Sequence, residues 1–272
     1  MDKKVIDDIV WYVPFKKLRN ALRIYLYELI AKNNELNNIS LQLNNISDKL
    51  YSDFIYKVDY NSILSLISKE SIKQSVEYIS NNGSNARIFV TKEELLKFVL
   101  EEYVKTSNYT NKLFLEFGVY SGHTINFCSS MFENTQFYGF DSFEGLPETQ
   151  SVWTKGEFDL KGNLPKVNKN VSLIKGYFSD TLPNFLKEHK EKISFMHIDC
   201  DLYSSSKSVF DNVYDRIEAG TVIQFDEYYN YPGWKNHEYK AFQEFCQKYQ
   251  VEYEYIGVSV MQVAVVIKSI KN

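Results

Sequence analysis

Residues 113–124 read Leu-Phe-Leu-Glu-Phe-Gly-Val-Tyr-Ser-Gly-His-Thr, an apolar run that ends in a glutamate and a turn with two glycines. Such a run is typical of a buried strand, and glycines directly after it let the backbone approach a bound ligand before a helix begins. Similar runs follow, separated by helical stretches, and this alternation predicts a parallel sheet with helices on both faces. The further runs are residues 136–140, 171–174, 193–198 and 221–225.

The last part of the chain has two more apolar runs, residues 251–258 and 262–268. Their short connection leaves no room for a crossover helix, so the two strands must pair antiparallel. Together with the five runs before them, they predict an α/β domain over residues 111–272. Its expected architecture is a Rossmann-like, seven-stranded, mostly parallel sheet with a C-terminal antiparallel hairpin.

The N-terminal part of the chain shows a different pattern, because apolar residues recur at heptad spacing between residues 15 and 50. This spacing predicts an N-terminal helical coiled-coil stem within residues 1–52, and self-association through it is the simplest use of such a seam. The alternative is that the helix breaks in the Asn-rich stretch and packs on its own domain. Residues 53–110 are expected to form a helical cap or linker.

The start of that stem has a second interpretation. Residues 9–23 combine aromatic and basic side chains, as peripheral membrane anchors do. The alternative is the solvated basic face of a coiled coil. No secretory leader or membrane-spanning run is evident, so we expect a cytoplasmic protein, membrane-associated if this segment acts as an anchor.

Composition narrows the class of partner. The formal net charge of -4 argues against a nucleic-acid partner, which requires a basic face. The 3 cysteines include no Cys-x-x-Cys pair, so neither a disulfide framework nor a zinc knuckle is indicated. A small-molecule substrate is therefore expected.

The glycine turn also carries information about the ligand. A dinucleotide site would have Gly-x-Gly-x-x-Gly, whereas this turn has Gly-x-x-x-Gly behind Glu116, and a carboxylate suits a cationic ligand better than a pyrophosphate. S-adenosylmethionine, which carries an ammonium and a sulfonium, fits that requirement. The second strand ends at Asp141, where a carboxylate can accept both ribose hydroxyls of a nucleoside. The expected cofactor contacts in this region are Glu116, Gly118, Tyr120, Ser121, Gly122, Thr124, Asp141 and Ser142.

Acidic residues also follow the fourth and fifth runs. Asp199 ends one strand, and Asp226 and Glu227 end the next. If these strands are neighbours, the three carboxylates converge at one edge of the sheet, and clustered oxygen ligands suit Mg²⁺, Mn²⁺ or Ca²⁺ rather than zinc. The alternative is a set of carboxylates that cap the following helices.

Five ordered motifs carry a resemblance to a known family. In this order they resemble the macrocin O-methyltransferases, class I methyltransferases that modify sugars on antibiotics and related natural products. The likeness runs from about residue 113 to 268 and does not include the stem. The motifs are residues 115–122, 140–147, 175–183, 197–203 and 225–228.

The resemblance implies roles for individual residues. It implies a divalent metal, expected to be Mg²⁺, at Asp199, Asp226 and Glu227. Asp199 would also contact the cofactor and take the proton of the acceptor. Glu227 departs from the family, which usually has a second aspartate there, and its longer side chain puts metal ligation by this residue in doubt. The adenine is expected near Gly176, Tyr177 and Phe178.

Aromatic residues near the metal strand are candidates for the acceptor site. Exposed rings at Tyr228, Tyr231 and Trp234 would offer flat faces to a sugar, with Trp153 as a lid. Core packing is the alternative for all four. Asp201 and Tyr203 complete the expected substrate contacts. His197 is interpreted as a core histidine whose side chain points away from the site.

These patterns favour a metal-dependent O-methyltransferase that acts on a hydroxyl of a sugar or another saccharide or natural-product precursor. A metal-dependent glycosyltransferase is the first alternative, because Asp199-x-Asp201 resembles the motif that holds a nucleotide sugar through Mn²⁺. A non-catalytic oligomeric scaffold is the second. The glycine turn and Asp141 favour the methyltransferase.

Overall fold

The computed structural model describes residues 10, 16–31 and 63–271, which belong to two compact units, residues 1–65 and 66–272. In the first unit, helix α2 spans Lys16–Ala31, within the predicted stem. Leu18 and Tyr25, on the predicted seam, are 50% and 52% exposed. The heptad positions 15, 36, 39, 43, 46 and 50 lie outside the described residues, as do residues 9 and 11–15 of the candidate anchor, so a coiled coil is not shown. No helix in the described ranges has the length and apolar character needed to cross a membrane.

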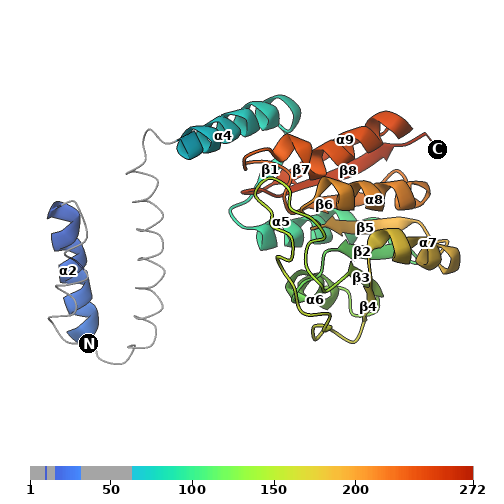
Figure 1. The fold of residues 1–272 in the computed structure, drawn as a ribbon, viewed down its shortest axis with the longest axis horizontal. Helices are drawn as coiled ribbons and strands as arrows, with labels where there is room; N and C mark the ends of the chain where they lie inside the picture. The colour runs from blue at the N-terminus through green and yellow to red at the C-terminus, as the bar shows by residue number, and fades with distance from the viewer. Residues whose placement is uncertain (1–9, 11–15, 32–62, 272) are drawn as a thin grey trace. The chain divides into compact units, whose positions relative to one another are not determined.

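The second unit is built on one sheet of eight strands (Figure 1), in the order β1-β7-β8-β6-β5-β2-β3-β4. The strand β8 pairs antiparallel with β6 and β7, and every other pairing is parallel. The predicted parallel strands and C-terminal hairpin are therefore confirmed. The strands are β1 Arg87–Ile88, β2 Leu113–Phe117, β3 Phe137–Asp141, β4 Val171–Lys175, β5 Ile193–Ile198, β6 Val222–Phe225, β7 Glu252–Val258 and β8 Val263–Ser269.

The expected count of seven strands is wrong by one. The extra strand, β1, has only two residues, both exposed, and pairs parallel with β7 at the sheet edge. A segment of this length has no detectable period, and its position depends on pairing with a strand far along the chain.

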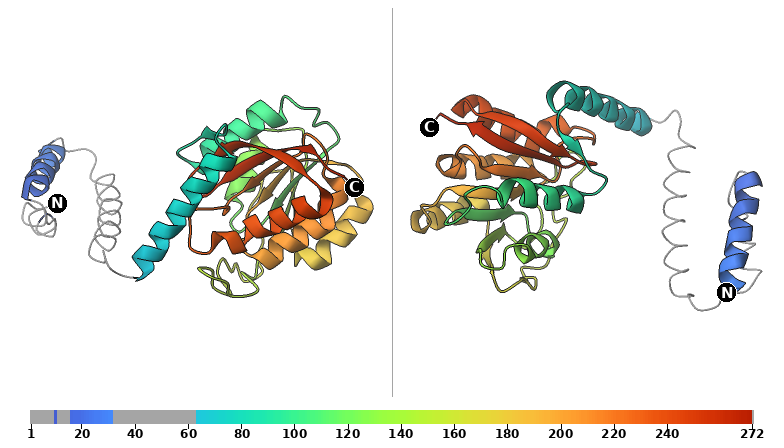
Figure 2. Two further views of the ribbon diagram at one scale, coloured as in Figure 1. Left: turned by 90° about the horizontal axis from the view of Figure 1, so that it is seen from above. Right: turned by 180° about the vertical axis from the view of Figure 1, so that it is seen from behind.

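Helices cover both faces of the sheet (Figure 2). The buried side chains of α7, α8 and α9 pack on one face, together with the last turns of α4, whereas those of α5 and α6 pack on the other. The helices are α4 Ile63–Asn82, α5 Lys92–Val99, α6 His123–Ser130, α7 Phe178–Glu188, α8 Tyr203–Val213 and α9 Glu238–Tyr249, and a π-helical turn, Leu100–Val104, extends α5.

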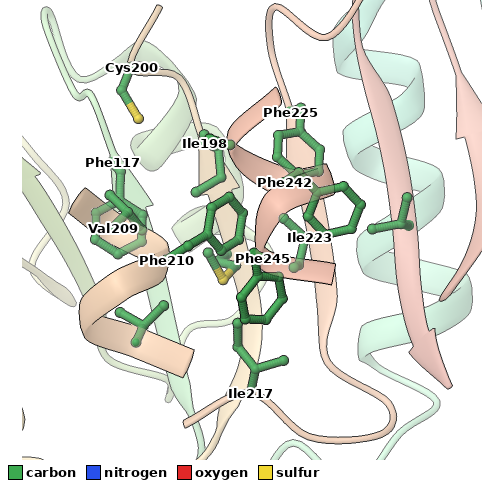
Figure 3. Close-up of a cluster of buried hydrophobic side chains, with 14 of the residues drawn as sticks. Phe117, Ile198, Cys200, Val209, Phe210, Ile217, Ile223, Phe225, Phe242 and Phe245 are labelled. Carbon is green, nitrogen blue, oxygen red and sulfur yellow. The ribbon is translucent and has the colours of Figure 1, made fainter. Parts of the chain in front are cut away.

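The apolar runs form strands because both of their faces are covered. All residues of β2, β5 and β6 are buried, which explains why these runs lack polar alternation. Phenylalanines from α8 and α9 meet the sheet residues Phe117, Ile198 and Phe225 in one cluster (Figure 3). This packing fixes the central strands, and with them the loops at their carboxyl ends.

The beginning of α5 is fixed by its sequence. Thr91 accepts a hydrogen bond from the backbone of Glu94, and the Glu94 side chain accepts one from the backbone of Thr91, so the two residues form a capping box. The first helical residue after this cap is Lys92. The capping box therefore fixes the start of α5 at Lys92, whose side chain lines the cavity described below.

Candidate active site

A cavity of about 520 Å³ lies at the carboxyl ends of β2, β3, β5 and β6. This is where open parallel sheets bind ligands, because loops diverge at that edge. Ten of the residues predicted from the sequence to bind the cofactor or the metal line this cavity. The predicted lining residues are Gly118, Tyr120, Asp141, Ser142, Gly176, Tyr177, Phe178, Asp199, Asp226 and Glu227, together with the predicted substrate residue Asp201.

The glycine turn after β2 lies directly against the end of β5. Gly118 has a φ of +89°, and a Cβ atom built on it would lie 1.7 Å from the backbone oxygen of Asp199. Only a residue without a side chain fits there. The turn therefore brings the cofactor loop and the acidic strand end into contact.

Asp141 fixes the same turn through its carboxylate. Its Oδ2 accepts hydrogen bonds from the backbone N–H groups of Val119 and Tyr120, each at 2.8 Å, and its Oδ1 accepts one from Phe143 at 2.7 Å. A carboxylate has further acceptor capacity, so these bonds leave room for a ligand hydroxyl. Asp141 thus shapes the loop as well as lining the cavity.

Glu116 is placed differently from the prediction. It is 2% exposed, does not line the cavity, and its Oε2 lies 3.5 Å from Nδ1 of His197. Strand register explains this contact, because Glu116, His197 and Gln224 occupy adjacent positions on β2, β5 and β6. The Glu116 carboxylate therefore lies beside the His197 ring and does not face the cavity, where a cationic ligand would bind.

His197 is a core histidine, as predicted, but its ring points toward the acidic residues at the strand ends and not away from them. His197 and Asp199 are two positions apart, and residues at that spacing share a face of a strand. The ring is fully buried, and its Nε2 lies 3.6 Å from Oδ1 of Asp226. Burial alone would lower the pKa of His197, but the carboxylates of Asp226 and Glu116 outweigh burial and raise the pKa to about 10.

Lys92 was not anticipated in the site. Its Nζ donates a hydrogen bond to Oδ2 of Asp226 at 3.0 Å, and its side chain is 31% exposed. Burial would raise the pKa of Asp226, yet His197 and Lys92 hold it at about 2. Nothing near Lys92 in the sequence signals this role, because the contact joins α5 to the end of β6.

The other carboxylates of the cluster lack such compensation. Burial, followed by the negative charge of Asp226, raises the pKa of Asp199 well above its usual range and that of Asp201 to about 7. Burial and the charge of Asp199 likewise raise the pKa of Glu227. Two carboxylates about 4 Å apart repel one another by about 4 kcal/mol when the effective dielectric constant is about 20, and this repulsion favours protonation of one of them.

Glu238, the first residue of α9, connects the loop that follows β5 to the loop that follows β6. It is fully buried, and its two oxygens accept hydrogen bonds from the backbone of Cys200 at 3.1 Å and of Glu227 at 3.3 Å. Sequence reasoning missed it, because an acidic residue at a helix start usually indicates a favourable helix dipole and nothing more.

Glu238→Gln should lower the free energy of unfolding by roughly 1–3 kcal/mol, because an amide offers one acceptor where two backbone donors need one each. Urea unfolding measures this change. The matched control is Glu244→Gln on the same helix, where a half-buried side chain accepts one hydrogen bond, from the Tyr203 hydroxyl at 2.8 Å, and a smaller change is expected. Equal effects of the two substitutions would contradict the bridging role.

The aromatic residues predicted to bind the acceptor do not expose their rings to the cavity. Tyr228 is fully buried and Trp234 is 1% exposed, and both pack around Tyr239 in the core. Tyr231 is 6% exposed and meets the ring of Trp153 edge-on. None of the four lines the cavity. Core packing, the alternative, describes Tyr228 and Trp234.

The remaining predicted residues lie close to the cavity without lining it. Ser121 is exposed, Gly122 precedes α6 with a φ of +81°, and Thr124 is buried on that helix. Tyr203 begins α8 and its hydroxyl bonds to Glu244. Sequence reasoning missed Ser204, Ser205 and Ser208, which line the cavity from α8. Their place on the helix directly after β5 was the available signal.

Comparisons with known proteins agree with this geometry. Residues 115–228 match the family described as a methyltransferase domain. Demethyldecarbamoylnovobiocin O-methyltransferase from Streptomyces niveus is 24% identical over 137 residues, which cover 43% of this chain and 50% of that protein. The chain therefore matches about half the length of this curated relative.

A solved structure shares the fold. CalS11, a calicheamicin methyltransferase, superimposes with a TM-score of 0.51 at 16% identity, over 76% of this chain and 94% of that one. The chain therefore shares the Rossmann-like fold of that protein, and residues 115–228 match the methyltransferase-domain family.

Proposed function

We propose that the protein transfers the methyl group of S-adenosylmethionine to a hydroxyl oxygen of a sugar or another natural-product precursor, with a divalent metal at the acidic cluster. The observation that carries the proposal is the direct contact between the glycine turn and the acidic strand end, at Gly118 and Asp199. The names of two similar proteins support this proposal, because one is a demethyldecarbamoylnovobiocin O-methyltransferase and the other a calicheamicin methyltransferase.

The cavity offers suitable groups for the nucleoside part of the cofactor. Asp141 lies at its wall with spare acceptor capacity for ribose hydroxyls, and Tyr177, 48% exposed, presents a ring on which a base can stack. In this proposal, the predicted cofactor residues that do not line the cavity stabilise the glycine turn instead of contacting the cofactor; they are Glu116, Ser121, Gly122 and Thr124. When bound, S-adenosylmethionine supplies an activated methyl group on a sulfonium.

The acidic cluster also fits a divalent cation. Oε2 of Glu227 is buried without a hydrogen-bond partner among the described residues, although the side chain lines the cavity. Oxygen-only donors of this kind are preferred by Mg²⁺, Mn²⁺ and Ca²⁺. A bound cation would lower the pKa of an acceptor hydroxyl by withdrawing charge from it. The family resemblance places Asp199, Asp226 and Glu227 as its ligands.

The residues of the chain perform the transfer by positioning and by accepting a proton. The acceptor oxygen must lie behind the methyl carbon, in line with the sulfur, so that the new C–O bond forms as the C–S bond breaks. Asp199 takes the hydroxyl proton, because its carboxylate lies at the cavity wall where the acceptor would bind. S-adenosylhomocysteine is then the neutral leaving group.

A thermal-shift measurement separates this reaction from sugar transfer. S-adenosylhomocysteine should raise the melting temperature of the full chain, and a uridine nucleotide with Mn²⁺ should not, because only a site for the former needs the glycine turn and Asp141. Stabilisation by the uridine nucleotide alone would favour the glycosyltransferase. Mass spectrometry after incubation with isotope-labelled cofactor and a sugar-nucleotide extract would then identify the acceptor.

The N-terminal segment has a separate place in this proposal. Residues 15–50 would join copies of the chain in the cytoplasm, while residues 9–23 could contact a membrane surface. Light scattering of the full chain gives its mass in solution. A monomer mass at working concentration would contradict association through the stem.

A further inference from the structure

The segment between β3 and β4 contains a hairpin arm over residues 143–162. Isolated antiparallel bridges join Glu144 to Asp159 near its base and Gln150 to Trp153 at its tip. The hairpin arm supplies part of the cavity wall from outside the sheet. Its residues that line the cavity are Gly145, Leu146, Pro147 and Phe158.

The tip of the hairpin arm reaches the elements that follow β5 and β6. The hydroxyl of Ser204, at the start of α8, donates a hydrogen bond to Glu148 at 2.6 Å. The hydroxyl of Ser151 donates one to the backbone oxygen of Pro232, after β6, at 3.0 Å. Because β2 lies between β3 and β5 in the sheet, the hairpin arm extends across the carboxyl end of β2 to make these contacts.

Phe158 is the aromatic residue that the hairpin arm brings to the cavity. Its ring is 39% exposed and meets the ring of Tyr120, in the glycine turn, edge-on at a centroid distance of 5.5 Å. The ring of Trp153 lies 6.4 Å from Phe158 and 6.2 Å from Tyr231, which follows β6. Phe158 thus lies between the glycine turn and the loop after β6. An acceptor has to bind in that region if its hydroxyl is to meet both the methyl group and Asp199.

Both rings that meet at the cavity are carried by an unfavourable backbone conformation. Tyr120 has a φ of +45° and Phe158 a φ of +64°, in the left-handed region that bulky residues rarely adopt. The backbone N–H of Tyr120 is held by Asp141, and the neighbours of Phe158, Glu157 and Asp159, both pair across the hairpin arm. Strain that the surrounding structure maintains in this way is common at ligand sites.

Tyr177, the other exposed ring at the cavity, is in a different place. It follows β4, and three strands, β5, β2 and β3, lie between β4 and β6 in the sheet. Phe158 is connected through Trp153 to the β6 side instead. A base stacked on Tyr177 therefore leaves Phe158 available to a second ligand.

The groups around Phe158 suit a saccharide ring. Such a ring has C–H groups on its faces, whose partial positive charge is attracted to the negative face of an aromatic ring, and it has hydroxyls along its edge. Ser205 and Ser208 bring hydroxyl groups to the same cavity from α8, and each hydroxyl can both donate and accept a hydrogen bond. The cavity thus combines an aromatic surface with hydroxyl partners.

We propose that Phe158 positions the acceptor by packing against one face of its saccharide ring, beside Tyr120. This inference rests on the proposed function and deepens it, because it names a residue that selects the acceptor. Packing of this kind stabilises the bound acceptor and the transition state alike, so its loss should raise KM for the acceptor more than it lowers kcat. Phe158 is a positioning residue, since its ring has no group that takes part in proton or methyl transfer.

Phe158→Ala tests this role in the full chain, with isotope-labelled S-adenosylmethionine and a dilution series of the sugar-nucleotide extract. The extract concentration that gives half of the maximal rate should rise about tenfold or more, because the acceptor loses the apolar surface of the ring. The maximal rate should stay within about threefold of the wild type. Phe158→Tyr keeps the ring and should stay within about threefold in both quantities.

Val152→Ala is the matched control, because it shortens an apolar side chain of the hairpin arm that is 48% exposed and does not line the cavity. It should change neither quantity. Phe158→Leu keeps an apolar side chain without the flat face, and it replaces the alanine variant if circular dichroism shows that the latter is unfolded. A rise of at least about threefold in the half-saturating extract concentration is then expected.

Calorimetric titration with S-adenosylhomocysteine separates the acceptor site from the cofactor site. Phe158→Ala should bind it within about twofold of the wild type. Weaker binding of S-adenosylhomocysteine with an unchanged half-saturating extract concentration would place Phe158 in the cofactor site and overturn the inference. If the wild type were active and the variant behaved like it in every measurement, the inference alone would fail. If the wild type bound S-adenosylhomocysteine but methylated nothing in the extract, the proposed function would fail and the inference with it.

Discussion

Asp199→Asn should lower kcat for methyl transfer by a factor on the order of 10² to 10⁴, the usual contribution of a general base. The asparagine keeps the size of the side chain but cannot accept the proton of the acceptor hydroxyl. It also removes a carboxylate whose oxygen lies within 4.8 Å of potential metal-ligand atoms of neighbouring residues, among them Asp226 and Glu227. The rate should be measured under saturating cofactor and acceptor, with S-adenosylhomocysteine binding followed in parallel.

A surface aspartate provides the control for this substitution. Asp215→Asn removes a carboxylate that pairs with Arg216 and does not line the cavity, so kcat should be unchanged. If Asp199→Asn kept full turnover while the protein remained folded, Asp199 would have no part in the mechanism. If it also lost S-adenosylhomocysteine binding, its role would lie in forming the cofactor site instead.

Gly118→Ala should abolish S-adenosylhomocysteine binding and lower the free energy of unfolding by at least ~2 kcal/mol, because two effects combine at this position. The backbone has a φ of +89°, which disfavours any side chain. The new Cβ would also lie 1.7 Å from the Asp199 carbonyl oxygen and 2.7 Å from its carbon. Backbone cannot rotate aside as a flexible side chain does, so the glycine turn and the strand end must separate.

Gly220→Ala separates those two effects. Gly220 has a similar φ of +91°, but a Cβ there would meet nothing within 4 Å. This variant should lose only the ~1–2 kcal/mol of a left-handed non-glycine residue and keep its cofactor site. Urea unfolding and calorimetric titration with S-adenosylhomocysteine measure both quantities. Equal behaviour of the two alanines would mean that the contact between Gly118 and Asp199 does not hold the site together.

The sheet could be predicted because its strands are buried on both faces. Runs such as residues 193–198 are mostly apolar and fully buried, and the closing hairpin has a connection too short for a helix. The edge strand β1 could not be predicted, since two residues carry no period. The stem's heptad pattern lies mostly outside the described residues and stays a prediction.

The candidate site was predictable where its residues follow a strand directly. Gly118, Asp141 and Asp199 all end strands or begin turns, and the sheet brings them to one cavity. Lys92 and Glu238 could not be found in this way, because each reaches the cluster from a helix start whose position depends on tertiary packing.

The prediction for the aromatic residues failed for a related reason. Sequence alone does not tell whether a ring after a strand faces solvent or folds back beneath it. Tyr228 folds back, and its hydroxyl bonds to that of Tyr255 at 2.9 Å in the core. His197 lies two residues before Asp199, so strand alternation places both side chains on the same face of the sheet.

A crystal structure of the full chain grown with S-adenosylhomocysteine and Mn²⁺ tests the central claim most directly. The ligand should occupy the 520 Å³ cavity with its ribose at Asp141 and its sulfur beside Asp199. A ligand bound elsewhere, or an empty cavity at saturating concentration, would contradict the assignment of this edge of the sheet as the site of methyl transfer.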